Sequence, residues 1–89
     1  MPERTVEIIN RNGLHARPAA EMVKTAARFQ SAITIERDDM SVNGKSIMGV
    51  MMLAAECGAS IRIVAEGADA DAALDALAAL VASRFGESA

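Results

Sequence analysis

Residues 32–47 read AITIERDDMSVNGKSI and hold the pattern that decides the fold. Apolar and polar residues alternate over 32–37, which is the period of a strand buried on one face. The pair Asp38-Asp39 is a two-residue break suited to a hairpin, and 40–43 is the short return strand. Strands with one apolar and one polar face favour an antiparallel sheet that helices cover on one side only.

Further elements are predicted on either side of this hairpin. Alternating residues predict strands over 4–9 and 61–66. Apolar residues at helical spacing predict a helix over 16–29 and a last helix from Asp69 or Asp71 to about Phe85. Ser46 stands at the N-cap position of a short helix over 47–55, and Gly58 marks its end. The expected core positions are Ala16, Ala19, Ala20, Val23, Ala26 and Ala27 in the first helix and Ala70, Ala73, Leu74, Leu77, Val81 and Phe85 in the last.

The predicted order of elements is β-α-β-β-α-β-α. This order gives an α+β fold, an open-faced two-layer β-sandwich in which three helices cover one face of a four-stranded antiparallel sheet. A chain of 89 residues is expected to form one domain, residues 1–89, and is too small to enclose a large active site.

Composition excludes several classes of function. The net charge is −3, and the chain has two Phe, no Trp and no Tyr, so it lacks the charge and the stacking rings of nucleic-acid-binding modules. No apolar run approaches the roughly 20 residues that cross a membrane, and the N-terminal residues lack a signal-peptide core. We therefore expect a cytoplasmic protein without membrane insertion. The single cysteine, Cys57, is expected to be a small buried residue in a reducing compartment.

The stretch NGLHARPA, residues 12–19, carries the most informative chemistry. His15 is the only histidine, and it lies between a glycine-bearing turn and the start of the first helix. The unpaired N–H groups of a helix N-terminus bind anions, and the guanidinium of Arg17 matches phosphate oxygens. A neutral imidazole is a nucleophile there, and the same groups would stabilise the phosphohistidine that it forms. The alternative interpretation leaves His15 as a surface or capping residue without a chemical task.

Other catalytic and metal-binding arrangements have little support. One histidine argues against a Ser-His-Asp triad and against a His-based metal site. Asp69, Asp71 and Asp75 lie close together in sequence, but helix capping and a solvated face account for them better than a metal site does. We expect no metal ion and no cofactor.

Three stretches in register resemble the HPr family, the histidine-containing phosphocarrier proteins of the bacterial phosphoenolpyruvate-dependent phosphotransferase system. They are GLHARPA at 13–19, KSIMGVM at 45–51 and AEG at 65–67, and the resemblance covers nearly the whole chain. The family's fold, four antiparallel strands covered by three helices, agrees with the fold predicted from the residues.

The resemblance implies a phosphoryl carrier rather than an enzyme with turnover of its own. His15 would accept a phosphoryl group on Nδ1 from phospho-enzyme I and pass it to an enzyme IIA domain, in support of sugar uptake and its regulation. Arg17 would stabilise the phosphoryl group, together with the backbone N–H groups of Ala16 and Arg17. We expect the carrier to be a monomer.

The short helix over 47–55 is apolar nearly all round, so it cannot bury all of its side chains against the sheet. Ile47, Met48 and Met51 are expected to remain exposed, and exposed methionines are typical of surfaces that bind several partners. Basic residues on the first helix would steer acidic partners toward this surface. The remaining candidates for partner contact are Leu14, Ala20 and Lys24.

Ser46 has two interpretations. The first is a helix cap and nothing more. In some HPr proteins the matching serine is phosphorylated by an ATP-dependent HPr kinase/phosphorylase, and residues 46–49 resemble those members. A phosphate at Ser46 would lie on a helix N-terminus and would add negative charge beside the expected docking surface. The sequence leaves open whether such a kinase acts on this chain.

Two alternatives to a sugar-type carrier stay open at this point. The first is a nitrogen-type regulatory phosphotransfer protein, which the neighbouring genes would distinguish. The second is a non-catalytic interaction module in which His15 is incidental. Incubation with enzyme I and phosphoenolpyruvate would separate this module from either carrier.

Overall fold

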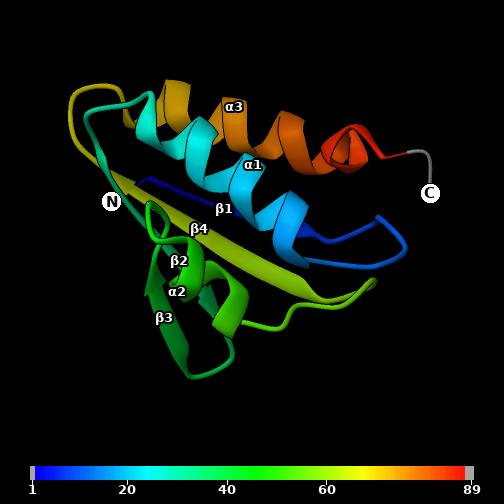
Figure 1. The fold of residues 1–89 in the computed structure, drawn as a ribbon. Coiled ribbons are helices and arrows are strands. Elements are labelled where there is room, and N and C mark those ends of the chain that lie inside the picture. Colours follow the sequence, from blue (N-terminus) through cyan, green and yellow to red (C-terminus); the bar gives the residue numbers. More distant parts are fainter. Residues whose placement is uncertain (1, 88–89) are drawn as a thin grey trace.

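The computed structural model describes residues 2–87 and contains a four-stranded antiparallel sheet with its helices on one face (Figure 1). The order of the strands across the sheet is β1-β4-β2-β3. The predicted α+β fold and its order of elements are confirmed. The strands are β1 (Glu3–Glu7), β2 (Ala32–Arg37), β3 (Met40–Asn43) and β4 (Ser60–Glu66), and the helices are α1 (Ala16–Ala27), α2 (Ile47–Met52) and α3 (Ala70–Ala82). A 3-10 turn, Arg84–Gly86, follows α3.

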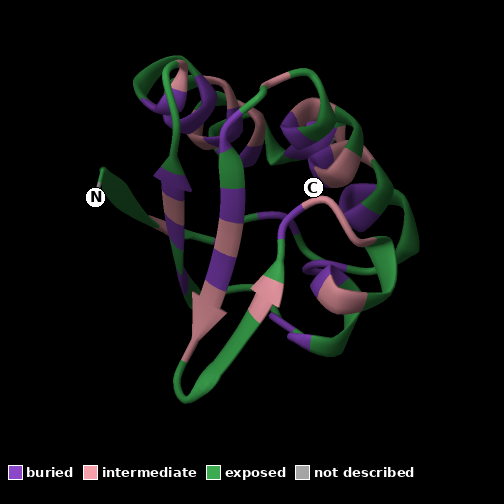
Figure 2. Ribbon diagram, turned by 90° about the vertical axis from the view of Figure 1, so that its left-hand side faces the viewer, coloured by how far each residue is buried: buried purple, intermediate pink, exposed green. Residues whose placement is uncertain are grey.

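The sheet buries one face against the helices, as the alternating residues predict. Ile35 of β2 lies opposite Ile63 of β4, and both side chains are fully buried. The other face is polar, and Arg62 forms ion pairs there with Glu36 and Glu3. Alternating buried and more exposed residues are visible along the strands in Figure 2.

Helix α1 presents a different face to the core from the one predicted. Its buried residues are Pro18, Ala19, Met22 and Ala26. The expected core residues Ala16, Ala20 and Ala27 are exposed instead. The buried face of α1 therefore includes Met22, which the predicted stripe of alanines and Val23 left out. The predicted stripe of α3 is confirmed, from Ala70 through Val81, and Phe85 is also buried.

Helix α2 is shorter than predicted and ends at Met52 rather than near Ala55. Leu53 is its C-cap, and Ala54 then takes a left-handed conformation with φ of 49°. Gly58 does not end this helix. It lies in the turn before β4, where its N–H donates to the Ile8 carbonyl at 2.7 Å.

Cys57 lies in the same turn and is exposed, so the expectation of a buried cysteine is wrong. Its neighbours Glu56 and Gly58 are exposed as well, so this part of the connection between α2 and β4 lies at the surface. Among residues 2–87, no helix is both long and apolar enough to cross a membrane.

Candidate functional site

His15 is the N-cap residue of α1, and its backbone is extended, with φ of −76° and ψ of −172°. Its side chain forms no capping hydrogen bond and is 40% exposed. The preceding turn closes with a hydrogen bond from the Gly13 N–H to the Asn10 carbonyl at 3.2 Å. This turn presents the imidazole at the surface, at the point where α1 begins.

Both the positive φ angle and the close approach of neighbouring atoms require a glycine in this turn. Gly13 has φ of +66°, and a Cβ atom there would lie 2.3 Å from the carbonyl oxygen of Ala55. Leu14 follows, and its N–H donates to that same carbonyl at 2.8 Å. The Leu14 side chain is only 4% exposed. Leu14 therefore belongs to the core, and its predicted place on a partner-binding surface is wrong.

The structure adds a carboxylate to the site that sequence reasoning missed. The Nε2 atom of His15 lies 2.9 Å from Oε2 of Glu87, across 72 positions of the chain. The second carboxylate oxygen of Glu87 accepts a hydrogen bond from Nδ2 of the buried Asn10 at 3.0 Å. That amide also donates to the Gly13 carbonyl at 2.8 Å, so the turn and the carboxylate are joined.

These contacts lower the pKa of Glu87 below its ordinary value, chiefly through the hydrogen bond from Asn10. The bond from His15 and the positive charge of Arg17 contribute in the same direction, while partial burial opposes them. Glu87 is therefore ionised at neutral pH and can only accept hydrogen bonds. A neutral His15 donates from Nε2 in this arrangement, which leaves the lone pair on Nδ1.

Three predicted site residues lie together at the start of α1. His15, Ala16 and Arg17 are all exposed. Pro18 has no N–H, and the Ala19 N–H donates to the His15 carbonyl at 3.0 Å. The helix therefore offers the N–H groups of Ala16 and Arg17 to an external acceptor. An anion bound here would meet two backbone donors, a guanidinium and a helix N-terminus.

The apolar surface of α2 is as predicted, with one addition. We call it the α2 patch, and its members are Ile47, Met48, Met51 and the unpredicted Met52, which are 41%, 73%, 42% and 65% exposed. The buried Val50 and Leu53 attach α2 to the core, and α2 packs against α1. Ala20 and Lys24 are exposed on α1.

Ser46 caps α2, as predicted. Its Oγ accepts a hydrogen bond from the Gly49 N–H at 3.2 Å, and its side chain is half-buried. The neighbouring Lys45 is turned away from the cap, since its ammonium donates to the Phe29 carbonyl at 2.8 Å. Because Ser46 directly precedes Ile47, its capping hydroxyl lies next to the α2 patch.

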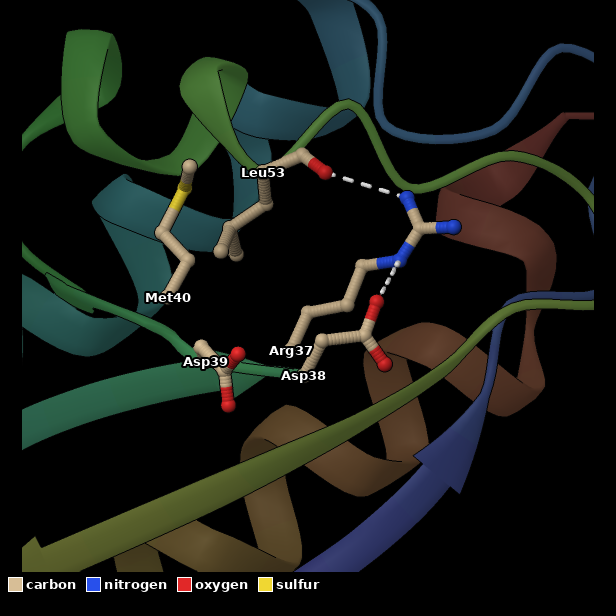
Figure 3. Close-up of a pocket in the computed structure, with 5 residues that line it drawn as sticks. All are labelled: Arg37, Asp38, Asp39, Met40 and Leu53. Carbon is tan, nitrogen blue, oxygen red and sulfur yellow. Dashed lines mark hydrogen bonds and ion pairs between the residues drawn. The ribbon is translucent and has the colours of Figure 1, made fainter.

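The acidic residue at the start of α3 binds the chain before β2. Asp69 is the N-cap residue, but its carboxylate makes no capping bond and binds Gln30 and Ser31 instead. Residues 2–87 contain no group of three or more His, Cys, Asp or Glu side chains that could hold a metal ion. The pocket in Figure 3 is lined by Arg37, Asp38, Asp39, Met40 and Leu53, none of which is a predicted site residue.

Comparisons with known proteins identify the family of this chain. Residues 2–83 match the family described as "PTS HPr component phosphorylation site". The phosphocarrier protein HPr of Treponema pallidum is 51% identical over 98% of this chain and 99% of its own. An HPr-like protein Crh from Halalkalibacterium halodurans is 48% identical over 91% of this chain and 96% of its own.

Solved structures show the same likeness. The crystal structure of HPr-C-His from Thermoanaerobacter tengcongensis superposes with a TM-score of 0.96, at 49% identity and with full coverage of both chains. Because the family match and these identities span nearly the whole chain, this protein belongs to the HPr family and is a phosphocarrier protein of the phosphotransferase system.

Proposed function

We propose that His15 is the phosphoryl acceptor and that its reactive atom is Nδ1. The observation that carries this proposal is the contact between Nε2 and the Glu87 carboxylate, which leaves the lone pair of a neutral ring on Nδ1. The ring is exposed at a helix N-terminus that has two free backbone donors. The N-terminus of α1 and the guanidinium of Arg17 would compensate the negative charge of a phosphoryl group on His15.

The chemical step follows from this geometry. The Nδ1 lone pair attacks phosphorus, a nitrogen–phosphorus bond forms, and the bond between phosphorus and the donor breaks. The imidazole gains positive charge as the new bond forms, and the carboxylate of Glu87 stabilises that charge through Nε2–H. Arg17 and the N–H groups of Ala16 and Arg17 stabilise the negative oxygens of the transferring group.

The proposed donor is phospho-enzyme I and the proposed acceptor is an enzyme IIA domain. Membership in the family implies partners within the phosphotransferase system. The α2 patch supports a docking role because it is apolar, exposed and rich in methionine. The relatives are named phosphocarrier protein HPr, which favours the sugar-type pathway over the nitrogen-type alternative. A cytoplasmic location stays a prediction, which cell fractionation would test.

The variant His15→Ala tests the acceptor directly. Incubation with phosphoenolpyruvate and enzyme I should label the wild-type chain and leave the variant unlabelled. Its stability should change by about 1 kcal/mol or less, because the lost side chain is exposed and makes no cap. An added IIA domain should then remove the label from the wild type. Labelling of His15→Ala at the wild-type rate would exclude His15 as the acceptor.

A further inference from the structure

Arg37 joins the β2–β3 hairpin to the segment in which α2 ends. Its Nη1 donates to the carbonyl oxygens of Leu53 and Ala54 at 3.0 and 2.8 Å. Its Nη2 donates to Oε1 of Glu56 at 2.5 Å. Figure 3 shows the guanidinium reaching across the pocket to Leu53, and Asp38 lies on its other side. One side chain therefore holds two carbonyls and one carboxylate of a single segment.

The segment 53–56 needs such an external contact. It has no regular secondary structure, and Ala54 takes a left-handed conformation that a residue with a Cβ atom adopts at a cost. The last carbonyls of a helix also lack partners within it, and a cation satisfies them well. The Arg37 side chain is only 23% exposed, and its bond to the Leu53 carbonyl is partly buried, whereas its bonds to Ala54 and Glu56 lie at the surface.

This same segment supports the loop that carries His15. The carbonyl of Ala55 accepts the hydrogen bond from the Leu14 N–H at 2.8 Å. Gly13 comes so close that a Cβ atom there would lie 2.9 Å from Cα of Glu56. Leu14 and Ala55 are both buried. The position of residues 55–56 therefore sets the position of the backbone directly before His15.

The chain between α2 and β4 is anchored separately at its other end, where it enters β4. The Ile8 N–H donates to the Ala59 carbonyl at 2.8 Å, and the Gly58 N–H donates back to the Ile8 carbonyl at 2.7 Å. These bonds hold the turn before β4 and make no contact with residues 53–54. At the α2 end, the Leu53 side chain is buried in the core, and Arg37 holds the backbone carbonyls of Leu53 and Ala54.

We propose that Arg37 is a positioning residue for phosphoryl acceptance, because it fixes residues 53–56 and so places Gly13, Leu14 and the His15 ring. The proposal rests on the proposed role of His15. Arg37 acts indirectly, through the backbone contacts that Gly13 and Leu14 make with residues 55–56. Loss of its guanidinium should loosen the His15 loop while the core remains folded.

The first test compares Arg37→Met with the matched control Arg62→Met. Arg62 also pairs with carboxylates, those of Glu36 and Glu3, but it lies on the open face of the sheet. Arg37→Met should speed hydrogen exchange of the Leu14 amide by about tenfold and shift the NMR signals of the His15 ring. Arg62→Met should leave both at their wild-type values. These readouts need no phosphoryl transfer, so they test Arg37 even if His15 proves not to be the acceptor.

The second test measures transfer from phospho-enzyme I at a range of concentrations. Arg37→Met should lower kcat by about tenfold with little change in KM, since a misplaced nucleophile reacts slowly once it is bound. Arg37→Lys, which keeps one charged donor, should recover part of the lost rate. If Arg37→Met fails to fold, the lysine variant decides, and it should fold with a reduced kcat. Unchanged Leu14 exchange, or an effect confined to KM, would overturn the proposal.

Discussion

At the scale of single residues, Glu87 is the side chain that contacts the His15 ring. The carboxylate fixes which ring nitrogen carries hydrogen, because an ionised carboxylate accepts hydrogen bonds and cannot donate them. Asn10 holds Glu87 in place and lowers its pKa, so the contact persists in mildly acidic solution. The 3-10 turn after α3, with the buried Phe85, brings Glu87 to the site.

We therefore expect Glu87→Gln to slow phosphorylation of His15 by about threefold to tenfold, since a neutral amide oxygen is a weaker acceptor than a carboxylate. Ring ¹⁵N NMR at neutral pH should show less of the form that has hydrogen on Nε2. Glu7→Gln, on the exposed strand β1, is the control and should change neither measurement. A wild-type ring spectrum in Glu87→Gln would mean that the carboxylate does not select the tautomer.

At the scale of elements, α2 combines a capped N-terminus with an exposed apolar face. Six residues form the helix, and the buried Val50 is its main attachment to the core. The Ser46 hydroxyl supplies the capping bond. Because the cap and the α2 patch adjoin, a charge added at one end of α2 changes the surface without entering the core.

Met48→Glu should weaken binding to enzyme I by about tenfold or more, because it places a charge at the most exposed position of the α2 patch. The melting temperature should stay within a few degrees of the wild type, since the side chain is not part of the core. Ala72→Glu is a suitable control, because Ala72 is exposed on α3 near the end that meets Gln30 and Ser31. Equal affinities for Met48→Glu and Ala72→Glu in a titration would remove the α2 patch from the docking surface.

Ser46→Asp should act in opposite directions on stability and on transfer. Aspartate caps a helix as well as serine does, and its charge suits the positive end of α2, so stability should stay level or rise by up to about 1 kcal/mol. The same charge adjoins the α2 patch and should slow His15 phosphorylation through weaker association with enzyme I. Thermal unfolding and initial rates on one preparation would measure both effects. An unchanged rate at every enzyme I concentration would leave Ser46 as a cap without regulatory effect.

At the scale of the whole molecule, Asp69 joins the helical layer to the sheet. Its carboxylate accepts hydrogen bonds from the N–H groups of Gln30 and Ser31 at 2.8 and 2.9 Å, and another from the Ser31 hydroxyl. These bonds tie the start of α3 to the chain that enters β2. The Ser31 hydroxyl, followed by the Gln30 N–H, lowers the pKa of Asp69 below its ordinary value.

A carboxylate whose pKa is lowered by folding stabilises the native state above its unfolded pKa, and this contribution is lost as the pH falls through the folded pKa. Asp69→Asn should therefore lower the melting temperature at pH 7. The difference from the wild type should begin to shrink near about pH 4, where the carboxyl of the unfolded chain binds a proton, and should vanish only below the lowered pKa of the folded Asp69. Asp71→Asn, at an exposed position of the same turn, is the control. A difference that stays constant from pH 7 to pH 2 would contradict this linkage.

The sequence by itself determined the elements and most of the candidate site. The hairpin strands over 32–37 and 40–43 agree with β2 and β3, because alternation and turn chemistry act between near neighbours. The cap at Ser46 is equally local. The placing of His15 and Arg17 at the start of α1 came from one short stretch that is both turn and helix start. Each of these features depends on residues a few positions apart.

The tertiary structure alone decided which distant residues meet. Glu87 reaches His15 across 72 positions and Asp69 reaches Ser31 across 38, and no local pattern marks either pair. Burial of Leu14 and exposure of Cys57 likewise depend on how the loops pack after the sheet and helices have assembled. Spacing predicts that a helix has an apolar face, but only the packing of α1 against the rest of the fold decided that Met22 rather than Ala20 lies in the core.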